Sequence, residues 1–586
     1  MPRKWMYLIL MTVILVSAGF GAKKEKETAP AAKWWQDAVF YQIFPYSYYD
    51  TDGDKFGDLN GITAKLDYLN YLGVTAVWLC PIHPRPEGMY HGYAVSDYYG
   101  IDPKLGTMKD FENLVKEAHK KGIKIVLDLV MNHTSLDNPW FLDSSTNKSS
   151  KYADWYLWEK TSLGWPNPTG NTKQPAWNLF NKPGIHNGHF YYAAFNMTLP
   201  DLNHANENVK KEFYKIAKFW LDKGVDGFRI DAARYVIETG PNEKQIDTPE
   251  TIKYLTDFAA YCKKQNPNAY IIAEAYAGID ITSKYYAPKG GMDAVFNFEI
   301  GGKGGVIMGA LQVGKPGGFL NIIKAFVSKA GVPQTFFSHF FSNHDGGRLP
   351  ENLKEPEKIK AAAAMFFTVP GGAPYIYYGD EIGLMEDYEE FGDVNKRGCM
   401  MWTGDKNGGF TTNNWVWTKK MKKFYLDPAK ADEKSKKEAM NLNVEYEKND
   451  PQSVLQLFRK MIALRKKYDV LKIGDFQMIS ITDAMLKNPD GSDKAPQNSI
   501  VSYVRVSGKQ ALFFIVNTGK NPVKVQAEFQ NKYFKDFAGK ISVADSIWGK
   551  DLTKPVDDKT AQDVLNGKID LEIAGRDFIV LVFQAK

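Results

Sequence analysis

Three carboxylic acids follow short apolar segments of the chain, and their positions suggest a catalytic role. Asp231 lies in GFRIDAARY, Glu274 in AEAY and Asp345 in SNHD. Two carboxyl groups that face one bond are what glycoside hydrolysis needs, because one attacks the anomeric carbon and the other protonates the leaving oxygen. We therefore predict Asp231 as the nucleophile, Glu274 as the acid/base and Asp345 as a residue that grips sugar hydroxyls.

Basic side chains near these acids fit the same chemistry. Arg229 lies two residues before Asp231, so both side chains point to one face of a strand, and the positive charge should keep Asp231 ionised. A crowded and partly apolar site would instead keep Glu274 protonated near neutral pH. His133, at the end of DLVMNH, and His344 would donate hydrogen bonds to sugar hydroxyls.

Eight continuous apolar runs must position these residues, and helical patterns lie between many of them. The predicted strands lie within residues 38–45, 74–81, 123–133, 225–232, 269–276, 293–300, 335–345 and 373–383. Continuous hydrophobicity indicates strands that are buried on both faces of a parallel sheet. The pattern predicts an α/β fold, a TIM-type (β/α)8 barrel, whose active site lies at the C-terminal ends of the strands.

The length of 586 residues predicts two or three domains. We predict a catalytic barrel over residues 34–470, with an inserted subdomain over residues 134–206 that is rich in Trp, Asn, Pro and Gly. From residue 471 to residue 586, short β-like runs separated by turn residues predict a C-terminal antiparallel β-sandwich.

The N-terminus and the composition bound the location and the partners. A basic MPRK and an apolar run too short for a membrane span predict a signal peptide over residues 1–22 and a linker over residues 23–33. We expect an exported monomer, secreted or periplasmic or at the cell surface, and membrane-bound only if the signal stays uncleaved. The net charge of +6 is too small for a nucleic-acid partner, and three distant cysteines form no disulfide or zinc pattern.

Together, DLVMNH, GFRIDAARY, AEAY and SNHD resemble the four signature segments of the α-amylase family, glycoside hydrolase family 13. The resemblance implies a retaining double displacement through a glycosyl-enzyme intermediate, with the carboxyl groups of Asp231 and Glu274 roughly 5–5.5 Å apart. It also implies that Asp345 stabilises the transition state and that Tyr93 forms an aromatic platform under the sugar. The substrate-binding residues would then be Tyr93, His133, Arg229, His344 and Arg397.

A loop with the sequence DTDGDKFGDLNGI holds four aspartates within nine residues. Such charges repel one another unless a cation such as calcium neutralises them. An EF-hand is excluded, because Lys55 and Gly61 stand where that loop needs Gly and Glu; a solvated turn is the alternative. By resemblance, a structural calcium would be held by Asp50, Asp52, Asp54, Asp58 and the main-chain oxygen of Phe56. Asn132 resembles a ligand of a second calcium whose other ligands are not evident.

The segments that bear on specificity point in two directions. LPDLN resembles the MPDLN of a group between oligo-1,6-glucosidases and neopullulanases, and Tyr90 stands where exo-acting α-glucosidases usually have Asp, which favours internal cleavage. KRGCMMW, around Arg397, resembles a segment of the family's glucosidases. Our main hypothesis is an α-amylase that cleaves internal α-1,4 bonds of starch and maltodextrins. Neopullulanase- or cyclomaltodextrinase-like hydrolysis, α-glucosidase action and transglycosylation stay open; a non-catalytic binding protein is disfavoured by the three carboxylates.

Overall fold

The computed structural model describes residues 33–288, 291–302, 304–386, 392–412, 442–479, 486–487, 499–528 and 541–585. The chain divides into two compact units, residues 1–33 and residues 34–586. The predicted signal peptide and all of the predicted linker except Lys33 lie outside the described residues. In the part of the chain that is described, no helix is both long and apolar enough to cross a membrane.

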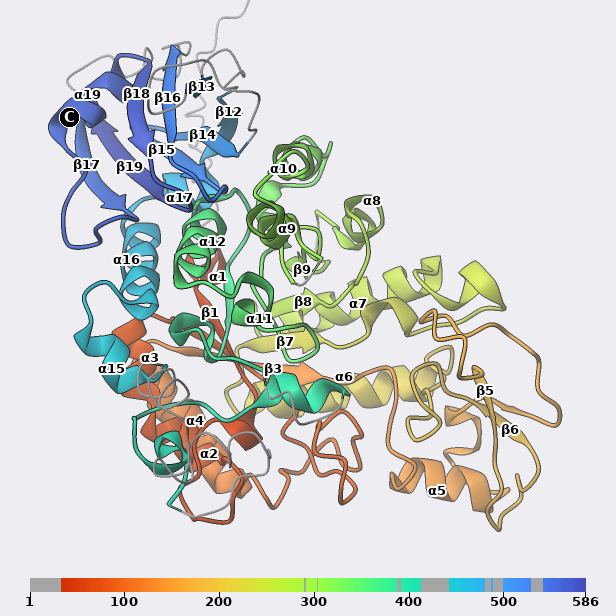
Figure 1. Cartoon of the computed structure of the whole chain (residues 1–586). Coiled ribbons are helices and arrows are strands. Elements are labelled where there is room, and N and C mark those ends of the chain that lie inside the picture. Colours follow the sequence, from red (N-terminus) through yellow and green to blue (C-terminus); the bar gives the residue numbers. More distant parts are fainter. Residues whose placement is uncertain are drawn as a thin grey trace, which may run out of the picture. The chain divides into compact units, whose positions relative to one another are not determined.

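Eight parallel strands form a barrel in the second unit (Figure 1). They are β1 (Phe40–Ile43), β2 (Ala76–Leu79), β3 (Lys124–Leu129), β7 (Gly227–Ile230), β8 (Tyr270–Ala273), β9 (Ala294–Phe296), β10 (Phe337–Ser338) and β11 (Tyr375–Tyr377). Their order is β10-β9-β8-β7-β3-β2-β1-β11, and a parallel bridge between Phe340 and Tyr375 joins the two ends. Each strand lies within one of the eight predicted segments, so the prediction of a TIM-type barrel is confirmed.

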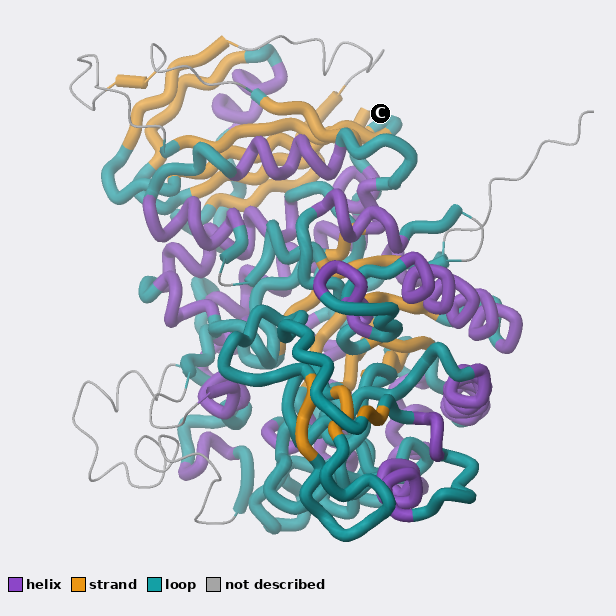
Figure 2. The backbone as a smooth tube through the Cα atoms, turned by 90° about the vertical axis from the view of Figure 1, so that its right-hand side faces the viewer, coloured by secondary structure: helices purple, strands orange, loops and turns teal. Residues whose placement is uncertain are grey.

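Helices alternate with the strands and lie outside them (Figure 2). The longer ones are α4 (Met108–Lys120), α6 (Glu207–Asp222), α7 (Pro249–Gln265), α9 (Val306–Val313), α10 (Phe319–Val327), α12 (Pro356–Thr368) and α16 (Val454–Lys467). Shorter ones are α1 (Trp34–Asp37), α2 (Leu59–Ala64), α3 (Leu66–Leu72), α8 (Ile279–Thr282), α11 (Leu349–Leu353), α15 (Val444–Asn449) and α17 (Val470–Ile473).

Helix α4 illustrates why these segments become helices. Thr107 caps its N-terminus and forms a reciprocal capping box with Asp110, which satisfies backbone N–H groups that have no partner inside the helix. The buried residues Phe111, Leu114, Val115 and Ala118 recur at helical spacing and form one apolar face. That face packs against the neighbouring strand β3.

Between β3 and α6 the chain forms a small insertion, within the segment predicted as a subdomain. It contains α5 (Pro139–Thr146) and a three-stranded sheet of β4 (Trp158–Glu159), β6 (Phe190–Tyr192) and β5 (Trp177–Leu179). Trp155 and Trp177 are buried inside it. These two indoles therefore belong to the core of the insertion and not to a sugar-binding surface.

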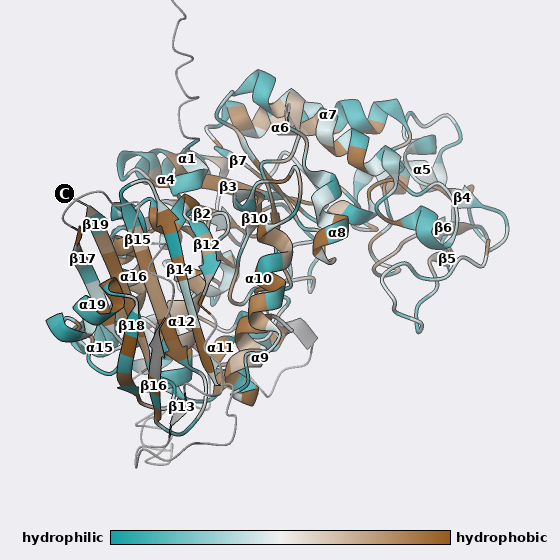
Figure 3. Ribbon diagram, turned by 90° about the horizontal axis from the view of Figure 1, so that it is seen from above, coloured by the Kyte–Doolittle hydropathy of each residue, from teal (hydrophilic) through white to brown (hydrophobic). Residues whose placement is uncertain are grey.

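The C-terminal region consists of two antiparallel sheets. The larger one contains β12 (Asp475–Met478), β14 (Ile500–Ser507), β15 (Gln510–Asn517), β19 (Phe578–Ala585) and β17 (Ile541–Trp548), in that order. The smaller one contains β13 (Leu486–Lys487), β16 (Val523–Glu528) and β18 (Lys568–Ile573), and α19 (Asp558–Leu565) packs on β18. Hydrophobic residues are concentrated in β15 and β19 (Figure 3), and residues of both sheets share one apolar core.

Candidate active site

One buried arginine connects three carboxyl groups at the C-terminal ends of β3, β7 and β8. Nη1 of Arg229 lies 2.5 Å from Asp231 Oδ1 and 2.8 Å from Asp128 Oδ1, and Nη2 lies 2.8 Å from Glu274 Oε2. Asp128 is fully buried, whereas 10% of the Asp231 side chain and 21% of the Glu274 side chain are exposed. A single guanidinium thus brings together the two predicted catalytic residues and Asp128, to which the sequence alone assigns no role.

The backbone around β7 explains this arrangement. The parallel register pairs Asp128 with Arg229, and the N–H of Glu274 donates to Ile230 O at 3.0 Å, so the three strand ends lie at one level. Ala232 has a φ of 48°, in the left-handed region that non-glycine residues rarely adopt. Its N–H donates to Glu274 Oε2 at 3.1 Å. This uncommon backbone conformation therefore coincides with a direct contact to the predicted acid/base, as strained residues at functional sites often do.

Burial raises the pKa of both predicted catalytic carboxyl groups. It raises the pKa of Glu274 to about 7 and the pKa of Asp231 to about 7, and the positive charge of Arg229 opposes both shifts. The sequence predicts that Arg229 keeps Asp231 ionised, but in the structure that charge is shared with two other carboxyl groups, which are Glu274 and Asp128. Asp231 and Glu274 therefore both have pKa values raised toward neutral pH, and the negative charge of each acts to raise the pKa of the acids beside it.

Asp345 differs from these two acids because 46% of its side chain is exposed. Its Oδ1 lies 2.9 Å from Arg397 Nη2, and its Oδ2 lies 3.1 Å from His344 Nε2. Burial acts to raise the pKa of Asp345, but the contact with His344 and the positive charges of Arg397 and of more distant cations outweigh it and hold the pKa at about 2. Asp345 is therefore an anion at neutral pH. Arg397, predicted from the sequence to bind substrate, is almost fully buried and also orients this carboxylate.

Tyr93 and the fully buried His344 form a stacked pair beside Asp128. Their ring centroids are 5.2 Å apart, and the Tyr93 hydroxyl lies 2.5 Å from His344 Nε2 and donates to Asp128 Oδ2 at 2.8 Å. The amide of Gln42 donates to His344 Nδ1 at 2.7 Å, so Nε2 carries the ring proton. Burial lowers the pKa of His344 to about 3, which keeps the ring neutral. The contribution of Gln42 has no signal in the sequence.

His133 is the remaining predicted sugar-binding residue. Burial lowers its pKa to about 3, so the ring is neutral. Its Nε2 atom is buried and has no hydrogen-bond partner in the described part of the chain. Because an unsatisfied buried nitrogen is rare, this atom is available to a ligand in the cavity.

Two cavities meet at Glu274, Ala232 and Asp345. The first has a volume of about 540 Å³ and is lined by the predicted sugar-binding residues Tyr93, His133 and Arg397 together with Tyr90, His91, Phe195, Leu199 and Asp231. The second has a volume of about 650 Å³ and extends past Tyr235, Tyr276 and Phe298. A ligand can therefore occupy space on both sides of the predicted acid/base.

Comparison with known proteins agrees with this geometry. Residues 42–474 match the family described as "Alpha amylase, catalytic domain". The chain belongs to the α-amylase family. As a member of this family, the protein is a retaining glycosidase, and its fold is the one expected from the sequence.

Relatives in the α-amylase family have different names. Alpha-amylase 3 of Dictyoglomus thermophilum is 36% identical over 459 residues, which cover 77% of this chain and 81% of the relative. The oligo-1,6-glucosidase of Parageobacillus thermoglucosidasius is 30% identical over 569 residues, with 84% and 91% covered. The crystal structure of the α-amylase from H. orenii has a TM-score of 0.70 at 28% identity and covers 94% of this chain and 99% of that chain. Family membership therefore does not choose between an amylase and a glucosidase.

The acidic loop of this α-amylase-family chain brings part of its predicted calcium ligands together. Carboxylate oxygens of Asp50, Asp52 and Asp58 lie within 4.8 Å of one another. Asp54 instead forms an ion pair with Lys104 at 3.0 Å. Three convergent carboxylates fit the preference of calcium for oxygen ligands. Asp54 does not belong to this cluster, and the main-chain oxygen of Phe56 stays a predicted ligand.

Asn132 has a buried neighbour that was not identified from the sequence. Burial raises the pKa of Asp201, from LPDLN, to about 8, although the nearby side chain of Asn132 acts to lower it. Oδ2 of Asp201 and Oδ1 of Asn132 are buried, with no hydrogen-bond partner in the described residues. The available signal was LPDLN itself, which served only as a marker of subgroup. Asp201 is thus the most direct candidate for a second oxygen ligand beside Asn132.

Proposed function

We propose that this glycosidase cleaves α-glucosidic bonds of short α-glucans such as maltooligosaccharides. The observation that carries the proposal is the contact of Asp231 and Glu274 with one guanidinium, next to a cavity lined by Tyr93, His133 and Asp345. The donors and acceptors of this cavity suit the hydroxyls of a glucosyl unit, and the ring of Tyr93 suits its apolar face.

In the proposed first step, Asp231 attacks the anomeric carbon through Oδ2, because Oδ1 is bound to Arg229. The bond from that carbon to the glycosidic oxygen breaks as the bond to Asp231 forms. Glu274 gives its proton to the leaving oxygen through Oε1, because Oε2 accepts from Arg229 and from Ala232. A covalent glycosyl-enzyme remains, and the leaving sugar departs through the cavity beyond Tyr276.

In the second step, Glu274 takes a proton from a water molecule, and the oxygen of that water attacks the anomeric carbon. The bond to Asp231 breaks, which restores both carboxyl groups and retains the anomeric configuration. Asp345, held as an anion by Arg397 and His344, binds hydroxyls of the same sugar. A hydrogen bond from His133 to a hydroxyl lowers the barrier where this bond strengthens in the transition state, and His344 positions Tyr93 and Asp345 through its Nε2 atom.

For the position of cleavage along the glucan, our first candidate is α-glucosidase-like release of glucose from the chain end. Arg397 lies in the segment that resembles the glucosidase side, and it holds Asp345 at 2.9 Å. One relative, covered over 91% of its length, is an oligo-1,6-glucosidase. Internal cleavage, as in an α-amylase, is the second candidate. It is favoured by the cavities on both sides of Glu274, by Tyr90 in place of Asp and by the relative named Alpha-amylase 3.

A product time course on maltoheptaose, isomaltose, pullulan, cyclodextrin and starch tests both candidates. Release of glucose alone from the first seconds supports chain-end cleavage, whereas an early ladder of oligosaccharides supports internal cleavage. Products longer than the substrate would identify transglycosylation, and panose from pullulan would identify neopullulanase-like action. NMR must find the α-anomer first; an initial β-anomer overturns the proposed roles of Asp231 and Glu274.

We further propose a structural calcium at the acidic loop, held by Asp50, Asp52 and Asp58. Calcium would supply positive charge to the loop, and no catalytic step depends on it. We also propose that the protein is exported, which rests on the basic and apolar N-terminal segment, and that it is a monomer. Fractionation of cells tests the export, and light scattering of the purified protein tests the monomeric state.

A further inference from the structure

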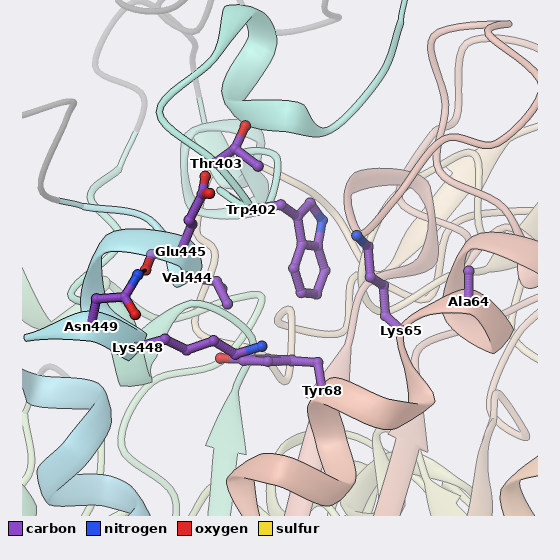
Figure 4. Close-up of a pocket in the computed structure, with 9 residues that line it drawn as sticks. All are labelled: Ala64, Lys65, Tyr68, Trp402, Thr403, Val444, Glu445, Lys448 and Asn449. Carbon is purple, nitrogen blue, oxygen red and sulfur yellow. Dashed lines mark hydrogen bonds between the residues drawn. The ribbon is translucent and has the colours of Figure 1, made fainter.

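A pocket separate from the catalytic cavities lies where three segments meet (Figure 4). Its volume is about 290 Å³, and none of the residues that line it lines either catalytic cavity. Lining residues come from the end of α2 and the start of α3, from the segment after Arg397, and from α15: Ala64, Lys65, Tyr68, Trp402, Thr403, Val444, Glu445, Lys448 and Asn449. The volume lies near the lower end of the roughly 300–1,000 Å³ range of ligand sites, so a monosaccharide-sized molecule would fit.

Two ammonium groups line this pocket. Lys65 Nζ lies 3.9 Å from the centre of the Tyr49 ring and 4.3 Å from that of Trp402. Lys448 Nζ lies 4.7 Å from the centre of the Tyr71 ring. Aromatic faces attract a cation but do not neutralise its charge.

Within the described part of the chain, neither lysine is paired with a carboxylate. No ion pair within 4.0 Å joins Lys65 or Lys448 to an acidic side chain of the described residues, and Figure 4 draws no hydrogen bond between the pocket residues. Burial lowers the pKa of Lys65 to about 8, and the positive charge of Lys448 lowers it further. The two like charges therefore destabilise one another, and an anion between them would remove that cost.

Polar groups of a different kind line the rest of the pocket. Figure 4 shows the carboxylate of Glu445 and the amide of Asn449 on the side opposite Lys65, with the Thr403 hydroxyl above Glu445. These groups can accept hydrogen bonds from the hydroxyls of a ligand, and the amide and the hydroxyl can also donate hydrogen bonds to them. A ligand that satisfies both sides of the pocket has an anionic group at one end and hydroxyls at the other.

We propose that this pocket binds a small hydroxylated anion, a monosaccharide-sized molecule that carries a phosphate ester or a carboxylate. The anionic group lies between Lys65 and Lys448, and the hydroxyls contact Glu445, Asn449 and Thr403. Charge-assisted hydrogen bonds to the ammonium groups provide most of the affinity. The site is additional to the proposed glycosidase function and does not depend on it.

Calorimetric titration of the Asp231→Asn protein tests the proposal without turnover. The probes are glucose 6-phosphate, gluconate, inorganic phosphate and glucose, at equal ionic strength and with maltotriose saturating the catalytic cavities. We expect glucose 6-phosphate or gluconate to bind at least about tenfold more tightly than glucose. Binding of only one of them identifies the source of the charge as phosphate ester or carboxylate. Binding of neither, or complete displacement by maltotriose, overturns the proposal.

Matched variants locate the binding. Lys448→Gln removes one ammonium group from the exposed rim of the pocket. We expect this change to weaken binding of the anion at least about tenfold. Lys109→Gln, at an exposed position of α4 outside the pocket, is the control and should bind as the parent protein does. Equal affinity of the Lys448→Gln and Lys109→Gln proteins would overturn the assignment to this pocket. Unchanged thermal unfolding of both variants excludes a loss of folding as the cause.

Discussion

The catalytic site and the acidic loop each gather three carboxylates, yet they balance the negative charge in different ways. In the catalytic site, Arg229 reaches Asp128, Asp231 and Glu274 at 2.5 to 2.8 Å. Because this arginine belongs to a barrel strand, its position is set by the fold itself. One positive charge for three buried acids leaves protons to be held near neutral pH, as general acid catalysis requires.

In the acidic loop, backbone N–H groups and the Thr51 hydroxyl, instead of a basic side chain, contact the clustered carboxylates. Asp50 accepts hydrogen bonds from the N–H groups of Gly53 and Lys55, and Asp58 accepts from those of Thr51 and Gly61. No ion pair with Asp50, Asp52 or Asp58 is found among the described residues. A fixed but insufficient cation therefore suits proton transfer, whereas a carboxylate cluster without a fixed cation suits a metal ion.

The largest effect is expected at the nucleophile. Asp231→Asn removes the attacking carboxylate but keeps the shape of the side chain, so kcat should fall on the order of 10⁴-fold. Steady-state kinetics on a maltooligosaccharide measures the loss, and circular dichroism with thermal unfolding checks that the fold is intact. Turnover close to that of the parent would mean that another residue is the nucleophile.

Removing the fixed cation tests the balance of charge in the catalytic site. Arg229→Met leaves Asp128, Asp231 and Glu274 buried without their shared partner, and the free energy of unfolding should fall by about 3–5 kcal/mol. Urea denaturation at pH 7 measures this change. If stability is unchanged, the three carboxyl groups do not depend on Arg229 for their charge balance.

Removing the proposed cation tests the acidic loop. Calcium at about 100 times its Kd should stabilise the folded protein by about 2.7 kcal/mol, so a chelator should lower Tm. Asp58→Asn should remove most of this effect, whereas Asp54→Asn should keep it, because Asp54 is paired with Lys104 outside the cluster. If neither calcium nor the chelator changes Tm, the loop is better described as a solvated turn without a metal ion.

The smallest effect is expected from a change of one pH unit. Below about pH 7 the nucleophile Asp231 gains a proton, and above about pH 7 the acid Glu274 loses one, so kcat/KM should fall on both sides. Each limb should approach tenfold per pH unit. A rate profile from pH 4 to pH 9 measures it. A plateau down to pH 4 would show that Asp231 stays ionised, which is the result expected if the positive charge of Arg229 acted on Asp231 alone.

Much of the catalytic site could be predicted because it follows from local periodicity. Continuous apolar runs identified all eight barrel strands, and the two-residue spacing of Arg229 and Asp231 placed both side chains on one face. The contact of Asp128 with Arg229 joins residues 101 positions apart, and that of Gln42 with His344 joins residues 302 positions apart. No local pattern predicts such pairs, because they depend on strand order and register.

The acidic loop divides in the same way. Its aspartates and their spacing are visible in the chain, but Lys104, which draws Asp54 away, is 50 residues distant. By itself, the sequence determined the barrel, the α-amylase family and the residues offered for catalysis, since these rest on hydrophobic period and on short motifs. Only the tertiary structure decided which charges share a partner and what their pKa values become, because burial and distance between remote side chains exist only in the folded chain.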